Sequence, residues 1–441
     1  MQFLARAHTT AQPQTRPSMN DGASDALTPA EVRRGLRLST LEGSLANIHI
    51  SVTTGAFATG FALLLGARDF ELGVIGALPF IGQLFQFVGA YLEERFGERK
   101  PMVLYSSLIS RVLWVLIAAL PFMTFLGSTQ LVLFLIILAV SQALLGITSN
   151  AWTSWMCDLV PPRQRGRYFG TRNMIASVTA MASTWLAGRA LDHYRGVGDE
   201  ATGYAVIFGG AVLLALASSV VLSMQPEPLT QPGKQQVQFL NLFSAPLRHA
   251  RFRSFAFACA GWALVTGIAA PFFNAYGIQN LHMSFQTIAL TAIVTSGVAL
   301  FSQPLIGRFQ DRFGDKTVLI GSAIGVVLIP WGWVLARPDF LLPVWVLSVL
   351  AGIFWPGITQ GLVNLLMDRA PAAGRGAYLA AYAAITGAGT FAAALLGGLI
   401  AAGLAGVTLH LGTLAIGHYA VLFIITSIGR AVMVGVFVRR L

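Results

Sequence analysis

The sequence predicts an all-α integral membrane protein, with twelve transmembrane helices in two pseudo-symmetric six-helix halves. Three observations lead to this prediction. The apolar residues fall into blocks of membrane-spanning length, the basic residues gather in alternate connections, and two polar motifs occur twice in the same order. Of the 441 residues, 55% are hydrophobic and only 11% are charged, whereas a soluble domain carries about 25% charged residues. The composition therefore excludes an ordinary soluble protein.

Each apolar block is long enough to form one membrane-spanning helix, because crossing ~30 Å of hydrocarbon takes ~20 apolar residues. The blocks lack the alternation of apolar and polar residues that marks an outer-membrane β-barrel, which favours a helical bundle. The predicted segments are 43–65, 72–92, 102–126, 131–156, 168–190, 203–224, 254–276, 286–307, 317–336, 341–366, 377–403 and 414–438.

Polar stretches divide the chain into four parts. The first part is rich in Pro, Thr and Gln and lacks the apolar core of a signal peptide. The sequence "TPAE" from Thr28 to Glu31 is a capping-box pattern, which predicts a short interfacial helix before the first segment. The predicted parts are a tail at 1–40, a first half at 41–224, a Pro- and Gln-rich connection at 225–251 and a second half at 252–441.

The basic residues indicate the orientation of the chain in the membrane. The formal net charge is +11, but the Lys and Arg residues are spread over many connections, which argues against a nucleic-acid footprint. Most of them fall on one side if the N-terminus is cytoplasmic, so the positive-inside rule predicts that both termini are cytoplasmic. A bacterial cytoplasmic (inner) membrane is the predicted location. The two cysteines show no pairing pattern, so no disulfide framework or metal site is predicted.

Two polar motifs recur half a chain apart. "EERFGERKPMVL" begins at Glu93 and is echoed by "QDRFGDKTVLIG", which begins at Gln310. "DLVPPRQRGRYFG" begins at Asp158 and is echoed by "DRAPAAGRGAYLA", which begins at Asp368. The shared order and the similar spacing indicate that one six-helix unit occurs twice, an organisation found in secondary transporters.

These motifs resemble those of the major facilitator superfamily. "GRFQDRFGDK" from Gly307 to Lys316 is similar to that family's loop motif Gly-x-x-x-Asp-Arg-x-Gly-x-Lys. The first-half copy departs from it, with Ala90 in place of Gly and Glu94 in place of Asp. The resemblance covers the chain after residue 40. It implies a secondary active or facilitative carrier of a small organic solute that works by alternating access, with the subfamily unresolved.

The resemblance also implies a cytoplasmic gate at the loops between segments 2 and 3 and between segments 8 and 9. In the family each loop acid braces a helix of the other half, so Glu94 would face Arg375 and Asp311 would face Arg165. The alternative is that these charges only flank helices and set the topology. The predicted gate residues are Glu94, Arg95, Gly97, Asp158, Arg165, Gly166, Gly307, Asp311, Arg312, Gly314, Asp368 and Arg375.

A solute cavity is expected between the halves, lined by segments 1, 4, 7 and 10 as the resemblance implies. These segments carry neutral polar and aromatic side chains, which suit a neutral or amphipathic organic solute. The alternative is that the polar groups hold helices together. The predicted cavity residues are Asn47, His49, Thr53, Gln86, Asn150, Trp155, Trp262, Asn274, Trp355 and Gln360.

Ionisable side chains within the segments are candidates for energy coupling. The 18 acids are expected in loops or near segment ends, with Glu42 among the nearest to entering. His49 is the first candidate for proton coupling because imidazole titrates near neutral pH, and Glu42 is the second; the alternative for His49 is a structural role. Arg111 is expected to pair within the scaffold or to snorkel, the alternative being an anion site, and Arg430 to snorkel. Facilitated diffusion remains open beside His49-dependent coupling.

Other classes of function find little support in the sequence. Neither a Walker-type phosphate loop nor a His-Glu-x-x-His pattern occurs, which argues against an enzyme or an ATP-driven pump. No cofactor or metal is expected. The expected partners are the lipid bilayer and a small-molecule solute, with a proton in the coupled case, and the chain is expected to be a monomer. The alternative on the same fold is a non-transporting receptor, assembly factor or lipid-handling protein.

Overall fold

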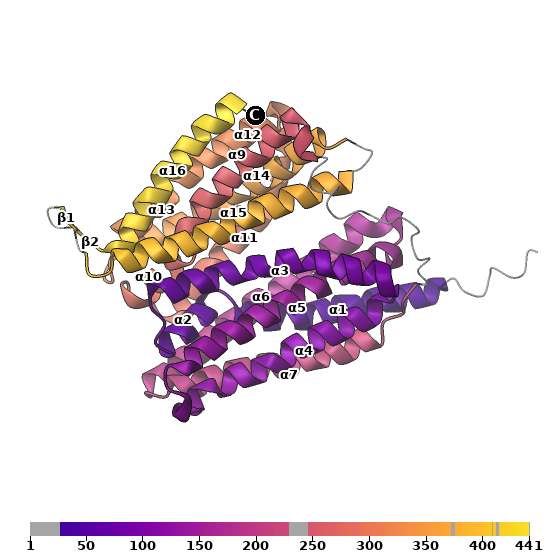
Figure 1. Cartoon of the computed structure of the whole chain (residues 1–441), viewed down its shortest axis with the longest axis horizontal. Helices are drawn as coiled ribbons and strands as arrows, with labels where there is room; N and C mark the ends of the chain where they lie inside the picture. The colour runs from indigo at the N-terminus through magenta and orange to yellow at the C-terminus, as the bar shows by residue number, and fades with distance from the viewer. Residues whose placement is uncertain (1–26, 229–245, 372–374, 408, 412–413, 441) are drawn as a thin grey trace, which may run out of the picture.

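The computed structural model describes residues 27–228, 246–371, 375–407, 409–411 and 414–440. Two helical bundles lie beside each other, the first half in indigo to magenta and the second in orange to yellow (Figure 1). The predicted fold class, a membrane protein of two six-helix halves, is confirmed. Most of the predicted connection at 225–251 lies outside the described residues.

The first half contains seven helices because its first segment is broken in two. Short 3-10 turns at Leu120–Phe122, Thr124–Leu126 and Pro162–Gln164 connect some of them. The helices are α1 (Pro29–Thr53), α2 (Ala56–Leu64), α3 (Asp69–Phe96), α4 (Arg99–Ala119), α5 (Thr129–Leu159), α6 (Arg165–Gly196) and α7 (Glu200–Ser223).

The second half repeats this pattern with two broken segments and one small hairpin. Its helices are α9 (Ala250–Ala269), α10 (Phe272–Gln279), α11 (Phe285–Phe313), α12 (Asp315–Val327), α13 (Ile329–Leu335), α14 (Leu342–Arg369), α15 (Arg375–Gly403) and α16 (His418–Arg440). Strands β1 (Leu409–Leu411) and β2 (Leu414–Ile416) pair antiparallel between α15 and α16. The last segment, predicted from residue 414, therefore begins at His418.

The start of the chain differs from the prediction. Thr28 and Glu31 do form the capping box: the backbone N–H of Glu31 donates to Thr28 Oγ1 over 3.3 Å, and Glu31 Oε2 accepts from the backbone N–H of Thr28 over 2.8 Å. The carboxylate of Glu31 accepts from the backbone N–H of Thr28 and, over 2.8 Å, from its hydroxyl; both bonds favour the charged form and lower the pKa of Glu31. The cap does not open a separate interfacial helix. Instead α1 runs without interruption from Pro29 to Thr53.

Ten described helical segments are long and apolar enough to cross a membrane. The other two predicted segments are the first, formed by α1 and α2, and the fifth, formed by α6. Helix α6 carries many charged residues, and α1 is polar along much of its length. Helix α1 packs against α6 and α7, so these polar surfaces meet each other inside the first half.

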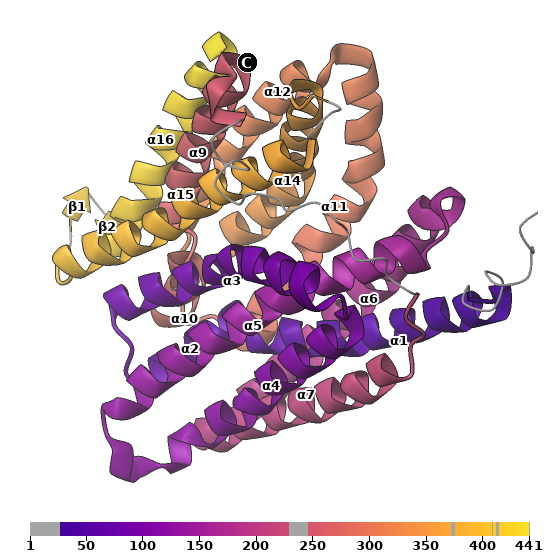
Figure 2. The same ribbon diagram turned by 45° about the vertical axis from the view of Figure 1, so that its right-hand side comes forward.

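The two halves touch at one end of the bundle and separate toward the other. Helix α3 packs against α15, and α6 packs against α11. We call the end with these contacts the closed end; it holds α2, α10 and the start of α11. The other end, which holds the turns at Gly97 and Gly314, is the open end, toward which α6 and α11 diverge (Figure 2).

The hydrophobic cores follow this division. At the closed end one cluster runs through both halves and includes Phe57 of α2, stacked on Phe285 of α11 with ring centres 6.2 Å apart. Toward the open end the halves have separate clusters, around Trp155 in the first half and around Phe252 in the second. The halves thus share buried apolar surface only at the closed end.

Candidate functional site

The first segment of each half is interrupted near the closed end. In the first half Thr54 and Gly55 separate α1 from α2, and Gly55 has φ +60°, a conformation that favours glycine. In the second half Ala270 and Pro271 separate α9 from α10, and proline removes a helical N–H donor. Both interruptions place irregular backbone beside the junction of the halves.

Three cavities meet at Asn274 of α10, next to these interruptions. The largest, about 420 Å³, lies within the second half, and we call it the second-half cavity. The central cavity, about 320 Å³, is bordered by α1, α2, α3 and α5 of the first half and by α9, α10 and α15 of the second. A third cavity, about 230 Å³, lies between α1, α2, α6, α10 and α11. Asn274 makes no hydrogen bond with another described residue, so its amide is free to bind a solute.

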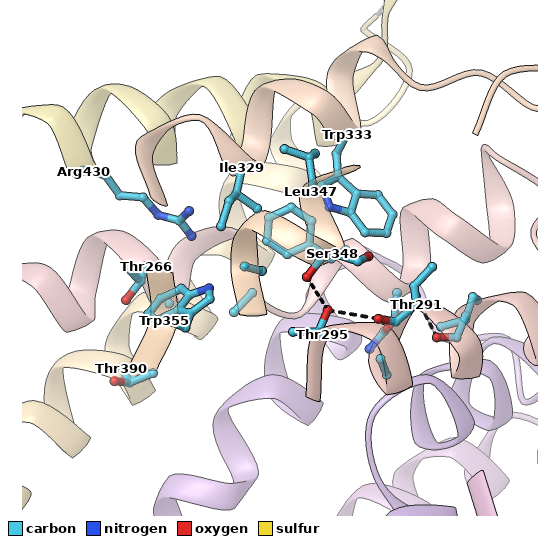
Figure 3. A pocket seen from close by; sticks show the side chains of 17 residues that line it. Thr266, Thr291, Thr295, Ile329, Trp333, Leu347, Ser348, Trp355, Thr390 and Arg430 are labelled. Atoms are coloured by element: carbon cyan, nitrogen blue, oxygen red, sulfur yellow. Dashed lines mark hydrogen bonds between the residues drawn. The ribbon is translucent and has the colours of Figure 1, made fainter. Parts of the chain in front are cut away.

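Seven helices of the second half build the second-half cavity (Figure 3). Aromatic and apolar side chains form most of its wall, and polar side chains interrupt it at intervals. The lining residues are Thr266, Gly267, Ala270, Phe273, Asn274, Ile288, Thr291, Ala292, Thr295, Ile329, Trp333, Leu347, Ser348, Ala351, Trp355, Thr390 and Arg430.

The hydroxyl groups of this cavity donate to helix backbones. Thr295 Oγ1 lies 3.0 Å from the carbonyl oxygen of Thr291 and 3.1 Å from that of Ser348 (Figure 3). Thr266 donates to the carbonyl of Trp262 over 2.8 Å, and Thr390 donates to its own helix. A hydroxyl has one proton to donate and two lone pairs, so these groups offer a solute acceptors rather than donors.

Arg430 of α16 was expected to snorkel, and this expectation is wrong. Its side chain is 2% exposed and reaches from α16 toward the other lining residues of the second-half cavity (Figure 3). One Nη1–H donates to the carbonyl of Val326 over 3.0 Å, and the guanidinium carbon lies 5.7 Å from the ring centre of Trp355. The face of α16 that carries Arg430 packs against α9, α12 and α13, which keeps the side chain away from the surface.

The charge of Arg430 has no acidic partner among the described residues. No carboxylate oxygen lies within 4.0 Å of it in the part of the chain that the structure describes, and its buried Nε–H makes no hydrogen bond. Burying an ion without a counter-charge is costly, so the guanidinium is the strongest unsatisfied group of the cavity.

Three of the predicted cavity residues line a cavity. Thr53 borders the central cavity, Trp355 borders the second-half cavity, and Asn274 borders all three. Gln142 and Thr390 also line the central cavity; Gln142 belongs to the polar side chains of segment 4 but is not among the predicted cavity residues, and Thr390 is not predicted by any pattern. A helix period locates a polar face but cannot tell a face toward a cavity from one toward another helix.

Three other predicted cavity residues make their contacts within the first half. His49 is 4% exposed and packs edge-on against Trp114, with ring centres 5.7 Å apart; its Nδ1 lacks a partner, and it lines none of these cavities. Asn47 donates to the carbonyl of Gly43 over 2.8 Å. Asn150 lies 3.4 Å from Glu93 Oε2.

The last four predicted cavity residues also lie outside the three cavities. Trp155 is fully buried and donates to the carbonyl of Pro226 over 3.1 Å. Trp262 is buried against Phe437. Gln86 is exposed on α3 and Gln360 is half-buried on α14.

Glu42 lies inside the first half rather than near a segment end, which corrects the expectation for the acids. It is 5% exposed at the middle of α1, because α1 begins well before the predicted segment. Its oxygens lie 3.5 Å from Arg111 Nη2 and 3.7 Å from Arg172 Nη2. Arg111 also donates to Ser219 over 2.5 Å. Arg111 thus pairs within the scaffold, as one of the two alternatives anticipated.

The loop motif of the first half is joined to α5 by a network that the sequence did not reveal. Arg99 lies 2.7 Å from Glu93 Oε1 and also pairs with Asp158. Ser154 donates to Glu93. The recurring motif predicted a role for Glu94, whereas its half-buried neighbour Glu93 makes these contacts.

The charges expected to pair across the open end do not meet in the described state. Asp311 is exposed and makes no ion pair with a described residue, while Arg165 donates to the backbone carbonyls of Cys157 and Val160. The side chains of Glu94 and Arg375 lie outside the described residues. Among the other predicted gate residues, Gly97 and Gly314 end α3 and α11 with φ +69° and +83°, Gly307 is half-buried, and Arg95, Gly166, Arg312 and Asp368 are exposed.

Two acids fasten the halves at the closed end. Asp192 of α6 accepts from the backbone N–H groups of Phe285 and Gln286, each over 2.8 Å, at the first turn of α11. Such a carboxylate satisfies the free amides of a helix start and its partial positive charge. Asp69 of α3 accepts from the hydroxyl of Tyr419 over 2.5 Å. Sequence alone could not pair these residues, which belong to opposite halves.

Comparison with known proteins agrees with this architecture. The family model described as Major Facilitator Superfamily matches residues 44–394 and 255–440. No curated protein matches the sequence. Among solved structures, a variant of the nucleoside transporter NupG matches with a TM-score of 0.72 and 12% identity, over 92% of this chain and 99% of that one. A bacterial homologue of the iron transporter ferroportin in its inward-facing state matches with a TM-score of 0.67 and 14% identity, over 94% and 99%.

Proposed function

Since this chain belongs to the Major Facilitator Superfamily, whose members are membrane transporters rather than enzymes, we propose that it carries a small organic solute by alternating access. The observation that carries the proposal is the set of cavities that meet at Asn274, two of which are bordered by helices of both halves. Rocking one half against the other around such a site would expose it to each side in turn.

We place the open end and both termini in the cytoplasm, in a bacterial inner membrane. The support is the excess of Lys and Arg in the connections at that end. In this orientation the described state faces inward, and the contacts of Asp69 and Asp192 close the outer side.

The proposed cytoplasmic gate forms in the other state. Asp311 would then approach Arg165, and Glu94 would approach the start of α15 at Arg375. The exposed, unpaired carboxylate of Asp311 in the described state supports this role, because an acid that pairs only when the end closes must be free when it opens.

We propose facilitated diffusion as the mode of transport. Glu42 already faces two arginines, and His49 packs on Trp114 away from the three cavities. Neither candidate therefore contacts the route of the solute. Proton coupling through His49 remains the competing proposal, and it predicts uphill accumulation that depends on the imidazole.

Uptake into proteoliposomes tests the proposal. Purified protein is reconstituted, and a panel of labelled neutral and charged organic solutes is offered with and without an imposed pH gradient. We expect saturable equilibration of at least one solute, with no accumulation above the outside concentration. Empty liposomes serve as the control. Gradient-driven accumulation that disappears in His49→Gln would favour the coupled alternative, and the absence of saturable uptake for the whole panel would contradict the transporter proposal.

A further inference from the structure

We infer that the second-half cavity is a binding site for a small organic carboxylate, whose negative charge pairs with Arg430. This inference rests on the proposed function, because it names the chemical class of the transported solute. Four properties of the site support it: the unpaired charge, the contrast with the first half, the set of free donors, and the apolar wall.

The unpaired charge is the first argument. Arg430 is 2% exposed, its Nε–H has no partner, and its only hydrogen bond to a described residue is the one to the Val326 carbonyl. A guanidinium carries five N–H donors in a planar fork that matches a carboxylate. A bound anion would supply the counter-charge that the described part of the protein does not.

The first half shows what the chain does with a buried arginine that has only a structural role. There Arg111, of the third segment, contacts Ser219 of the sixth segment and is neutralised by Glu42. In the second half the third and sixth segments are also joined by an arginine, but here the arginine belongs to the sixth segment: Arg430 donates to the carbonyl of Val326 on the third. Among the residues that the structure describes, no acid faces the arginine of the second copy, although the contact between the two segments is similar.

The free donors of the cavity point to an anion. The hydroxyls of Thr266, Thr295 and Thr390 give their protons to backbone carbonyls. The charged donor that remains in the cavity is Arg430, and the Asn274 amide is a neutral one. A carboxylate accepts hydrogen bonds only, and a charge-assisted bond from a guanidinium is about twice as strong as a neutral one.

The wall of the cavity fits an organic anion of a single charge. Phe273, Trp333 and Trp355 supply aromatic surface, and the volume of about 420 Å³ is in the range of small-molecule sites. One guanidinium neutralises one negative charge, and the apolar wall would leave further charges without hydration. Carboxylates with a hydrocarbon or aromatic body therefore fit better than phosphates or dicarboxylates.

The first test compares acids with their neutral amides on the unmodified protein. Thermal unfolding in detergent is followed at increasing concentrations of benzoate and benzamide, and of hexanoate and hexanamide. We expect at least one acid to stabilise the protein and to bind about ten-fold or more tightly than its amide, which is the size expected of one hydrogen bond to a charged group. Equal stabilisation by acid and amide, or none by either acid, would overturn the inference.

The second test removes the charge. Arg430→Gln should abolish the preference for the acid, Arg430→Lys should keep part of it, and Arg439→Gln, an exposed position on the same helix, should leave it unchanged. A preference that survives in Arg430→Gln would contradict the assignment. If Arg430→Gln does not fold, the comparison of acid with amide on the parent still decides.

Transport separates this inference from the function on which it rests. Binding of a carboxylate that depends on Arg430, without saturable uptake of that carboxylate or of any other solute of the panel, would refute the transporter proposal and leave the anion site standing. Saturable uptake of a neutral solute by the parent and by Arg430→Gln alike, without any preference of the parent for an acid over its amide, would refute the anion site and leave the transporter standing.

Discussion

At the scale of single residues, charge and burial have to be considered together. Arg430 lies in an apolar segment, close enough to the segment end for its long side chain to reach the membrane surface, and this position predicts snorkelling. The sequence does not show which face of α16 points into the bundle. That orientation depends on the packing of α16 against α9, α12 and α13. Glu42 was misjudged for a related reason, because the capping box at Thr28 was expected to start a separate helix and instead starts α1.

Glu42→Gln should destabilise the protein by about 3–5 kcal/mol, because it leaves the buried charge of Arg111 and the half-buried charge of Arg172 without their counter-charge. Thermal or denaturant unfolding in detergent measures the loss. Asp339→Asn, at an exposed position without an ion pair to a described residue, is the matched control and should have little effect. An unchanged unfolding midpoint in Glu42→Gln would show that the pair is not a structural element.

At the scale of elements, the repeated motifs and the apolar blocks predicted the number and order of the segments. They did not predict the break at Gly55 or the hairpin before α16, whereas a break at Pro271 is what a proline within a segment predicts. Hydropathy is an average over the residues of a segment, so an interruption of the helix by one or two residues does not change it detectably. The contacts between elements were also beyond the sequence, since small residues such as Gly73 give no signal of the helix they approach.

Gly73→Val should push α3 away from α15 at the closed end. A Cβ atom at Gly73 would lie 2.7 Å from the carbonyl oxygen of Ala394 and from Cα of Gly398, and backbone atoms cannot move aside as a flexible side chain can. A cysteine placed at residue 54 in a cysteine-free background should then become accessible to a membrane-impermeant thiol reagent from the outer side. Gly210→Val, at a helical glycine with open space around it, is the control. Equal labelling of the parent and the Gly73→Val protein would contradict a role for this crossing in closure.

Asp192→Asn should loosen the same end by a different route. An amide oxygen can accept from only part of the α11 start and brings no negative charge to it, so the bonds to Phe285 and Gln286 weaken by about 1–2 kcal/mol. Distance measurements between spin labels on α6 and α11 should show a larger population with the closed end apart. Asp199→Asn, which caps α7 within the first half, should leave that distance unchanged. An unchanged distance in Asp192→Asn would show that Asp192 does not hold α6 and α11 together.

At the scale of the whole molecule, the twofold organisation was predicted from the repeat, and the described state was not. In the proposed alternating-access cycle the loop motifs concern charges that would meet when the open end closes, whereas the described state has that end apart.

Under this proposal Asp311→Ala should slow uptake about ten-fold or more, as loss of a charge-assisted contact formed only in the other state, while the protein remains folded. Asp339→Ala is the control, and normal uptake by Asp311→Ala would disprove the gate role of this residue.

The apolar cluster that continues through both halves at the closed end also has a calorimetric consequence. Separating the halves there would bring rings such as Phe57 and Phe285 into contact with water, and the hydration of apolar surface raises the heat capacity. Hydrophobic association weakens on cooling. The balance between the two orientations of the carrier should therefore curve with temperature, and cold should shift it toward the one that faces outward.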